Sequence, residues 1–325
     1  MKCEPRGSAP VSAQSAVSSQ FRRSVLRLSF FLMHPNTTSH FFTVDVEEYF
    51  QVQALESAVA RADWIWQPTR LARSIDDLLA RLDRYSATGT FFVLGWIAKH
   101  RPEVVRDIAA AGHEVASHGY WHERVTALDR DAFREDVRSS KQVLEDLIGK
   151  EVVGYRAPSF SIIPGCEWAF DVLLEEGYGY DSSLFPIRRR GYGYPNAPRI
   201  PHVIQRPAGF LAEFPLATTS ILRYPVPAAG GGYLRQFPLG IIRRAFREAS
   251  ARGEPATFYI HPWEIDPGQP RLPVSALNRI RHYRGLGDTL GRIDCLLEEF
   301  SFTTIASHLP ALEASHGTML TVGAA

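Results

Sequence analysis

Residues 41–48 are Phe-Phe-Thr-Val-Asp-Val-Glu-Glu, and this stretch decides the fold class. An apolar run rich in β-forming residues that ends in acids predicts a buried strand with polar side chains at its carboxyl end. Because side chains alternate along a strand, Asp45 and Glu47 face the same side, and Glu48 faces the other unless the strand has ended. Taken alone, these acids are as consistent with a solvated strand end as with a functional site.

A strand followed by a helix recurs along most of the chain beyond this stretch. Strands that alternate with helices predict a parallel sheet, either open or closed into a barrel. The number of units in about 270 residues favours a closed or nearly closed barrel. No Gly-rich phosphate loop follows the first strand, which argues against a dinucleotide-binding fold. The expected strands are 41–46, 90–94, 113–117, 151–155, 178–181, 256–260 and 302–305, and the expected helices are 71–82, 102–111, 129–148, 167–176, 238–252 and 288–299.

Two regions interrupt this alternation. Residues 182–236 are rich in Pro, Gly, Arg and Tyr, and we expect a long inserted excursion with short strands such as Leu211–Pro215. Residues 264–287 are expected to form a Pro-rich loop. The predicted organisation is a disordered or misassigned tail at 1–40, a barrel at 41–306 and a frayed tail at 307–325.

The composition excludes several classes of protein. Hydrophobic residues make up 45% and charged residues 22% of the chain, which excludes wholesale disorder, collagen and a multi-span membrane protein. The net charge of +1 gives no electrostatic reason to expect nucleic acid or an anionic membrane as a partner. The cysteines Cys3, Cys166 and Cys295 are too few and too widely spaced for a disulfide framework or a thiolate zinc site. Nothing in the sequence indicates an oligomeric state.

The N-terminal tail allows two interpretations. Residues 22–27 resemble a twin-arginine export signal. The apolar run that follows, 28–33, is shorter than the ~7–15 residues of an export signal and far too short to span a membrane. We therefore expect translation to begin at Met33 and a cytoplasmic protein without an integral membrane span, with export as the alternative.

Polar side chains follow the predicted strands at their carboxyl ends. In a barrel these ends converge on one face, where active sites are built. Several such coincidences carry more weight than any single motif, because each residue alone is also explained as a cap, a surface charge or a buried structural group. The residues in question are Asp45, Glu47, His118, His122, Arg156, Asp181 and His261.

Ser117–His122 places two imidazoles four residues apart. If the segment turns helically, both rings lie on one face and can bind one metal ion. A carboxylate from another strand end would complete a site that leaves one position open for water. At a further strand end, the guanidinium of Arg156 can orient a carboxylate through bidentate hydrogen bonds.

Taken together, these segments resemble the polysaccharide deacetylases, the carbohydrate esterase family that shares the NodB homology domain. The resemblance spans about residues 41–306 and is closest to the subgroup found with exosortase and exopolysaccharide gene clusters, for which 182–306 is the family-specific part. The five motifs that match in order are the acidic strand end at 43–48, Ser117-His118-x3-His122, Arg156-x-Pro158, Tyr180-Asp181-Ser182-Ser183-Leu184 and Tyr259-x-His261.

The resemblance implies a distorted (β/α) barrel, one divalent metal ion and removal of acetyl groups from an N-acetylated polysaccharide or oligosaccharide. The metal would be held by Glu47, His118 and His122. Glu48 is the alternative acidic ligand, because Val46 stands where the commonest form of the motif has its second acid. Zinc is the usual metal, and these donors would also accept cobalt, nickel or iron.

The resemblance also implies roles for the other motif residues. Asp45 would act as general base, and Arg156 would hold it in place. His261 would protonate the leaving amine, and Asp181 would raise the pKa of His261 or fix its tautomer. Aromatic side chains would bind the sugar or belong to the core, and the candidates are Tyr120, Trp121, Phe160 and Trp263.

Two other functions remain open at this point. The same barrel and metal geometry could cleave a small amide or a cyclic ureide, although the aromatic residues of 182–236 favour an extended substrate. Alternatively, Val46 in the first motif could mark a glycan-binding protein that has lost catalysis. The intact His118, His122, Arg156 and His261 argue against that loss.

Overall fold

The computed structural model describes residues 38–189, 191–314 and 319–321. The expectations for the export-like stretch 22–27 and for a start at Met33 lie outside these residues. The strands are β1 (His40–Val46), β2 (Thr90–Val93), β3 (Glu114–Ser117), β4 (Gly154–Tyr155), β5 (Tyr180–Asp181), β6 (His202–Arg206), β7 (Gly209–Glu213), β8 (Thr218–Ile221), β9 (Tyr224–Pro227), β10 (Thr257–Ile260), β11 (Phe302–Thr303) and β12 (Met319–Thr321). The α-helices are α2 (Leu71–Arg84), α3 (Gly95–His100), α4 (Pro102–Ala110), α5 (Arg130–Ile148), α6 (Trp168–Glu175), α7 (Gly231–Gln236), α8 (Leu239–Ala251), α9 (Ala276–Tyr283), α10 (Thr289–Glu299) and α11 (Leu309–Ala314).

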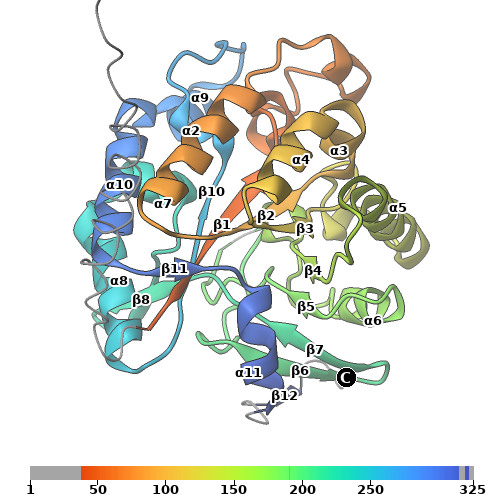
Figure 1. The fold of residues 1–325 in the computed structure, drawn as a ribbon, viewed down its shortest axis with the longest axis vertical. Helices are drawn as coiled ribbons and strands as arrows, with labels where there is room; N and C mark the ends of the chain where they lie inside the picture. Colours follow the sequence, from red (N-terminus) through yellow and green to blue (C-terminus); the bar gives the residue numbers. More distant parts are fainter. Residues whose placement is uncertain (1–37, 190, 315–318, 322–325) are drawn as a thin grey trace, which may run out of the picture. The chain divides into compact units, whose positions relative to one another are not determined.

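A curled, mostly parallel sheet forms the centre of the fold, with helices around it (Figure 1). Its order is β10-β1-β2-β3-β4-β5-β7-β6-β12, and β11 pairs with the start of β1. Only the β6–β7 pair in this sheet is antiparallel among the described strands. Isolated bridges from Leu216 to Thr257 and from Gly230 to Tyr259 join the chain beyond β7 back to β10. The expected distorted (β/α) barrel is confirmed. Among the described strands no pairing joins β10 to β12, so the sheet is curled without full closure.

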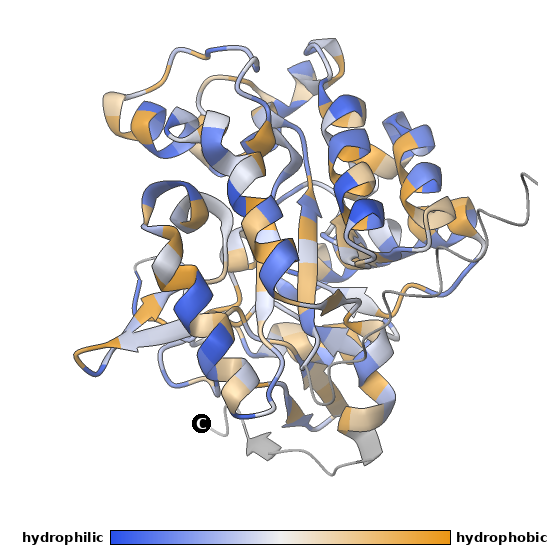
Figure 2. Cartoon of the chain, turned by 60° about the vertical axis from the view of Figure 1, so that its left-hand side comes forward, coloured by the Kyte–Doolittle hydropathy of each residue, from blue (hydrophilic) through white to orange (hydrophobic). Residues whose placement is uncertain are grey.

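Helix α5 shows why the helix predictions agree with the structure. Asp129 caps its start by accepting a hydrogen bond from the Ala132 N–H at 2.8 Å, and Gly149 ends it with a φ of 65°. The residues it buries lie three or four positions apart on one face, as a helix that covers a sheet requires, and are Phe133, Asp136, Val137, Ser140 and Leu144. Figure 2 shows similar apolar and polar stripes on other helices.

The excursion at 182–236 contributes to the sheet, which the sequence did not predict. Strands β6 and β7 form an antiparallel pair, and β7 pairs in parallel with β5. The glycines at 230–232 allow the chain to approach β10 closely, because a Cβ on Gly230 would lie 1.9 Å from the carbonyl oxygen of Tyr259. Only β8 and β9 form a separate two-stranded sheet among the described residues.

Other boundaries also differ from the sequence predictions. The strand expected at 151–155 is reduced to β4, because side chains of α5 bind the backbone of Val152 in place of a neighbouring strand. The loop expected at 264–287 contains α9, capped by Ser275. The tail expected to fray from residue 307 begins instead with helical residues and includes α11 and β12. No helix in the described part of the chain is long and apolar enough to cross a membrane.

His40, at the start of β1, is expected to make the free energy of unfolding depend on pH. It is buried, accepts the Ala256 N–H at Nδ1 (3.1 Å) and contacts Ser250 Oγ through Nε2 (2.9 Å), and burial lowers its pKa from 6.5 to about 4. The unfolded chain therefore binds this proton first, and the folded state loses up to about 2 kcal/mol of stability as the pH falls from about 7 to about 5.

The His40→Asn variant keeps an acceptor for Ala256 but cannot take up the proton. Urea unfolding of both proteins at the two pH values measures the effect. We expect the loss of unfolding free energy on acidification to be smaller in the variant by about the same 2 kcal/mol. An equal loss in both proteins would contradict the assignment.

Candidate metal centre and active site

The carboxyl end of β1 directs its acids to opposite sides, as strand alternation predicts. Asp45 and Glu47 face the interior end of the barrel and are buried. Glu48 turns away, and its carboxylate accepts hydrogen bonds from the Thr69 hydroxyl and from the Arg70 N–H. Glu48 is thereby engaged in the loop before α2, which leaves Glu47 as the acid that meets the histidines.

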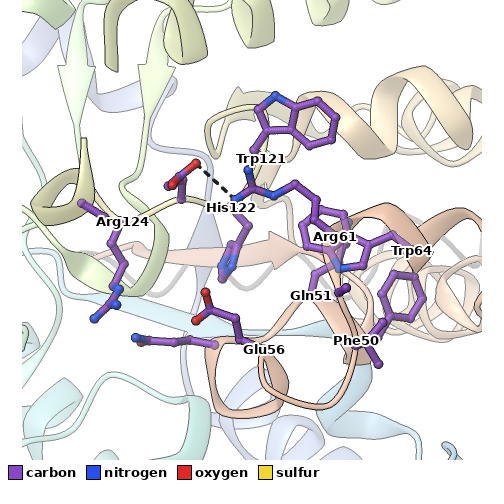
Figure 3. Close-up of a pocket in the computed structure, with 13 residues that line it drawn as sticks. Phe50, Gln51, Glu56, Arg61, Trp64, Trp121, His122 and Arg124 are labelled. Carbon is purple, nitrogen blue, oxygen red and sulfur yellow. Dashed lines mark hydrogen bonds and ion pairs between the residues drawn. The ribbon is translucent and has the colours of Figure 1, made fainter. Parts of the chain in front are cut away.

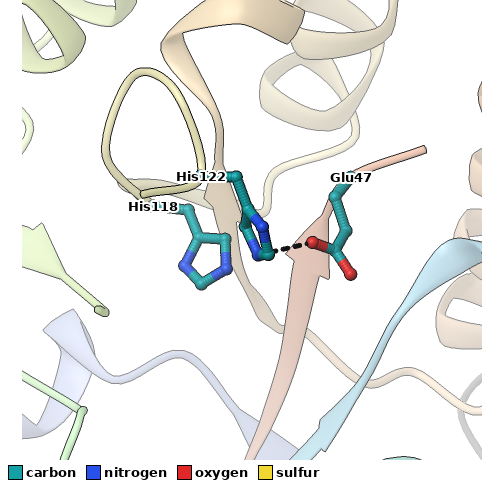
Figure 4. Close-up of side chains that lie close together, drawn as sticks. All are labelled: Glu47, His118 and His122. Atoms are coloured by element: carbon teal, nitrogen blue, oxygen red, sulfur yellow. Dashed lines mark ion pairs between the residues drawn. The ribbon is translucent and has the colours of Figure 1, made fainter. Parts of the chain in front are cut away.

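Glu47, His118 and His122 form a compact group at this end of the sheet (Figure 4). One ligand atom from each residue lies within 4.8 Å of the others. The Nε2 atom of His122 lies 2.7 Å from Oε2 of Glu47. His118 uses Nδ1 to contact the carbonyl oxygen of Arg156 at 2.9 Å, which leaves its Nε2 for a ligand.

A loop brings the two histidines together, so the helical turn considered from the sequence is wrong. Gly119 has a φ of 74° and His122 a φ of 55°. A positive φ costs a non-glycine residue roughly 1–2 kcal/mol, so the surroundings must impose it at His122. Asp136 on α5 fixes the loop by accepting the N–H groups of Tyr120 (2.9 Å) and Trp121 (3.1 Å). Asp136 was not predicted from the sequence.

The chemistry of this group fits a divalent cation. Burial lowers the pKa of His118 to about 4, so its ring is neutral, as a metal ligand must be. Burial would raise the pKa of Glu47, but the facing imidazoles, His122 above all, lower it below its usual range. Oε2 of Glu47 is buried and accepts no hydrogen bond of good geometry. A cation would satisfy this oxygen, which is otherwise costly to bury.

Arg156 holds Asp45 in place through a buried ion pair. Its Nη1 donates to Oδ1 of Asp45 and to the Thr43 hydroxyl, both at 2.7 Å. Its remaining donors contact Ser182, with Nε on the carbonyl oxygen (2.9 Å) and Nη2 on the hydroxyl (2.8 Å). The guanidinium is therefore shared between three residues and makes a single contact to the carboxylate, where the sequence suggested a bidentate one.

His261 follows β10 and faces the same group. Its Nε2 lies 3.8 Å from Oδ2 of Asp45 and 3.6 Å from Oε1 of Glu47. Its Nδ1 lies 2.8 Å from Oε2 of Glu264. Burial would lower the pKa of His261, but the carboxylates, Glu264 first, raise it to about 9.

The assignment of Asp181 as the partner of His261 requires correction. Asp181 accepts the hydroxyl of Ser183 at 2.6 Å, and the same hydroxyl accepts the Ala157 N–H at 2.8 Å. Asp181 thus supports the segment after Arg156, and the carboxylate that contacts His261 is Glu264. The spacing of three residues between His261 and Glu264 was the signal in the sequence that could have revealed this pair.

Two neighbouring cavities share His122 and Gln53 at this end of the barrel. One, of about 240 Å³, is lined by Asp45, Glu47, His118, His122 and His261, together with Phe160, Tyr192 and Tyr259. The other, of about 360 Å³, is drawn in Figure 3 and is lined by Trp121, Trp64 and Arg61 among others. The Cζ atom of Arg61 lies 5.5 Å from the centroid of a Trp121 ring, and its Nη2 atom forms an ion pair with Oε2 of Glu123 at 3.1 Å.

The four aromatic candidates therefore separate into two groups. Phe160 and Trp121 line these cavities, one in each. Tyr120 instead packs on Gly95, where its ring occupies the space that a Cβ would take. Trp263 is buried and donates its Nε1–H to Oε1 of Glu47 at 3.0 Å, so it contacts a candidate ligand rather than open space. Tyr192, Tyr259, Trp64 and Arg61 are lining residues that the sequence analysis did not single out.

Two family models match the chain. Residues 68–163 match the model described as polysaccharide deacetylase, and residues 182–310 match the model described as a domain of unknown function (DUF3473). The peptidoglycan deacetylase of Helicobacter pylori is 35% identical over 112 residues, which are 34% of this chain and 36% of that protein. The chitooligosaccharide deacetylase of Rhizobium leguminosarum bv. trifolii is 36% identical over 67 residues, 21% of this chain and 31% of that protein. The chain thus spans about a third of the length of these relatives.

Solved structures share the fold. The protein of Mycobacterium smegmatis assigned as a polysaccharide deacetylase has a TM-score of 0.59 at 21% identity and covers 89% of this chain and 95% of its own. Puue allantoinase has a TM-score of 0.54 at 16% identity and covers 86% of this chain and 90% of its own. At these identities the likeness concerns the fold alone.

The candidate site draws on both matched regions and on the strand that precedes them. His118, His122 and Arg156 lie within the first match, whereas His261 and Glu264 lie within the second. The motifs, the curled barrel and the first family match agree with one another. Over residues 68–163 the chain is thus similar to the polysaccharide deacetylase family.

Proposed function

We propose that the protein is a metal-dependent hydrolase that removes N-acetyl groups from an N-acetylated amino sugar in a polysaccharide, in exopolysaccharide biosynthesis. The observation that carries the proposal is the arrangement of Glu47, His118 and His122 beside Asp45 and His261 on one cavity. The relatives named peptidoglycan deacetylase and chitooligosaccharide deacetylase support this reaction class. The exopolysaccharide role is supported by the resemblance to the subgroup found with such gene clusters.

Glu47, His118 and His122 would hold the divalent ion. Two imidazoles and one carboxylate suit zinc and leave a coordination position for water, and cobalt, nickel or iron would also be accepted. When bound, such an ion lowers the pKa of its water and polarises the acetamide carbonyl group.

Asp45 and His261 would move the protons. Asp45, oriented by Arg156, accepts a proton from the attacking water through its free oxygen Oδ2. Collapse of the tetrahedral oxyanion breaks the C–N bond, and Nε2 of His261 donates the proton that the leaving amine requires. Because Oδ2 and Nε2 lie only 3.8 Å apart, both groups reach the same reacting centre. The products are acetate and the free amino sugar.

Val46 does not mark a lost metal ligand. Its side chain is fully buried in the hydrophobic core, on the opposite side of β1 from Asp45 and Glu47. Glu47, the residue that follows Val46 at the end of β1, would supply the carboxylate ligand instead. This arrangement favours an active hydrolase over a glycan-binding relative without catalysis.

The Glu47→Gln and Glu48→Gln variants test which acid binds the metal. Both carboxylates are buried at the end of β1, so the two changes are matched in size and position. We expect Glu47→Gln to weaken metal binding by more than the ~10–100-fold caused by loss of an outer-shell partner, and Glu48→Gln to keep one metal per chain. Mass spectrometry of the metal content measures both. Loss of metal from Glu48→Gln alone would reverse the assignment.

The Asp45→Asn and His118→Ala variants separate proton transfer from metal binding. Asparagine at 45 cannot accept a proton, so acetate release from N-acetylglucosamine oligomers should fall by about 10²-fold or more while the metal remains bound. Alanine at 118 removes a ligand, so metal and activity should be lost together. Full turnover in Asp45→Asn would exclude it as the general base.

A further inference from the structure

Glu264 controls the side of His261 that faces away from the cavity. Its Oε2 lies 2.8 Å from Nδ1 of His261 and 3.1 Å from the backbone nitrogen of the same residue. Both residues belong to one tight turn, because Pro262–Ile265 is a 3-10 helix that begins after His261. A carboxylate on Nδ1 fixes that nitrogen as a hydrogen-bond donor and directs Nε2 toward Asp45 and Glu47.

Arg235 on α7 holds Glu264 in turn. Its Nε donates to Oε1 of Glu264 at 2.6 Å, and both side chains are buried. Its other nitrogens donate to backbone carbonyls at the end of α9, those of Arg281 (3.0 Å), His282 (2.8 Å) and Arg284 (2.7 Å). These main-chain hydrogen bonds hold the guanidinium of Arg235 in place, and the guanidinium in turn fixes the position of the Glu264 carboxylate. Burial would raise the pKa of Glu264, but Arg235 and then His261 lower it to about 2.

Trp263 connects the same turn to the metal ligands. It donates its Nε1–H to Oε1 of Glu47 at 3.0 Å. Its ring is stacked between His261 (5.1 Å between centroids) and His282 (4.2 Å). The His261 turn and the α7 and α9 segments that hold it all lie within the match to a domain of unknown function.

We propose that Glu264 and Arg235 are positioning residues for His261, and that residues 182–310 complete the active site by holding this acid against Asp45 and Glu47. The inference rests on the proposed function for the role of His261 as an acid. The geometry itself is independent of the reaction, because it concerns which ring nitrogen of His261 donates to Glu264.

The Glu264→Gln variant tests the proposal. An amide cannot accept from Arg235 and from His261 at once without turning its NH₂ group toward one of these donors. We expect kcat to fall by about 10²-fold, with KM and metal content unchanged. In metal-free protein, the downfield Nδ1–H proton resonance of His261, assigned through His261→Gln, should be present in the wild type and absent from Glu264→Gln.

The matched control is Asp171→Asn. Asp171 on α6 forms a bidentate ion pair with Arg206 on β6 (3.0 and 2.8 Å), and neither residue lines the two cavities of the site. This variant should keep the kcat and the His261 resonance of the wild type even where its melting temperature falls as far as that of Glu264→Gln.

Each outcome decides a separate point. Unchanged kcat and resonance in Glu264→Gln would overturn the proposal, as would a wild-type His261 protonated only on Nε2. If the wild type released no acetate, the proposed function would fail, and the resonance alone would still decide whether Glu264 fixes His261.

Discussion

The buried ion pair between Arg156 and Asp45 is the interaction on which the site depends. A guanidinium without solvent is tolerated only when its donors are satisfied, and Arg156 meets this requirement with groups from β1 and from the segment after β5. Its side chain orients the candidate base, and its backbone carbonyl orients His118. One residue thereby sets both the proton acceptor and one metal ligand, which ties the chemistry to the closure of the sheet.

The two regions that match different family models contribute different parts of the same centre. The region at 68–163 supplies the histidine pair after β3 and Arg156 after the adjacent strand β4, whereas His261 comes from 182–310. Parallel pairing of β1 with both β2 and β10 brings these parts to the two sides of Asp45 and Glu47. The excursion that interrupts the strand–helix alternation supplies β6, β7 and α7, so it is part of the barrel wall and of the support for His261.

The sequence predicted the features that neighbouring residues determine, namely strand alternation and helix ends. The alternation at 43–48 placed Asp45 and Glu47 on one side, and the caps of α5 lie where Asp129 and Gly149 indicate. The partner of His261 was predicted wrongly, because Asp181 and Glu264 both lie near strand ends and the spacing of three residues between His261 and Glu264 was not used. Strand β6 and helix α9 were missed because their Pro-, Gly- and Arg-rich surroundings mask any periodicity. Contacts with distant parts of the chain stabilise them, from β12 to β6 and from Ala54 to α9.

The most direct test of this account is a titration of metal-free protein with zinc, with acetate release from N-acetylglucosamine oligomers followed at each step. We expect activity to rise linearly and to stop rising at one equivalent per chain, in line with the single group of Glu47, His118 and His122 found in the described part of the chain. Two results would contradict this expectation: a rate of acetate release that is already maximal without metal, or one tightly bound equivalent of zinc that restores no acetate release.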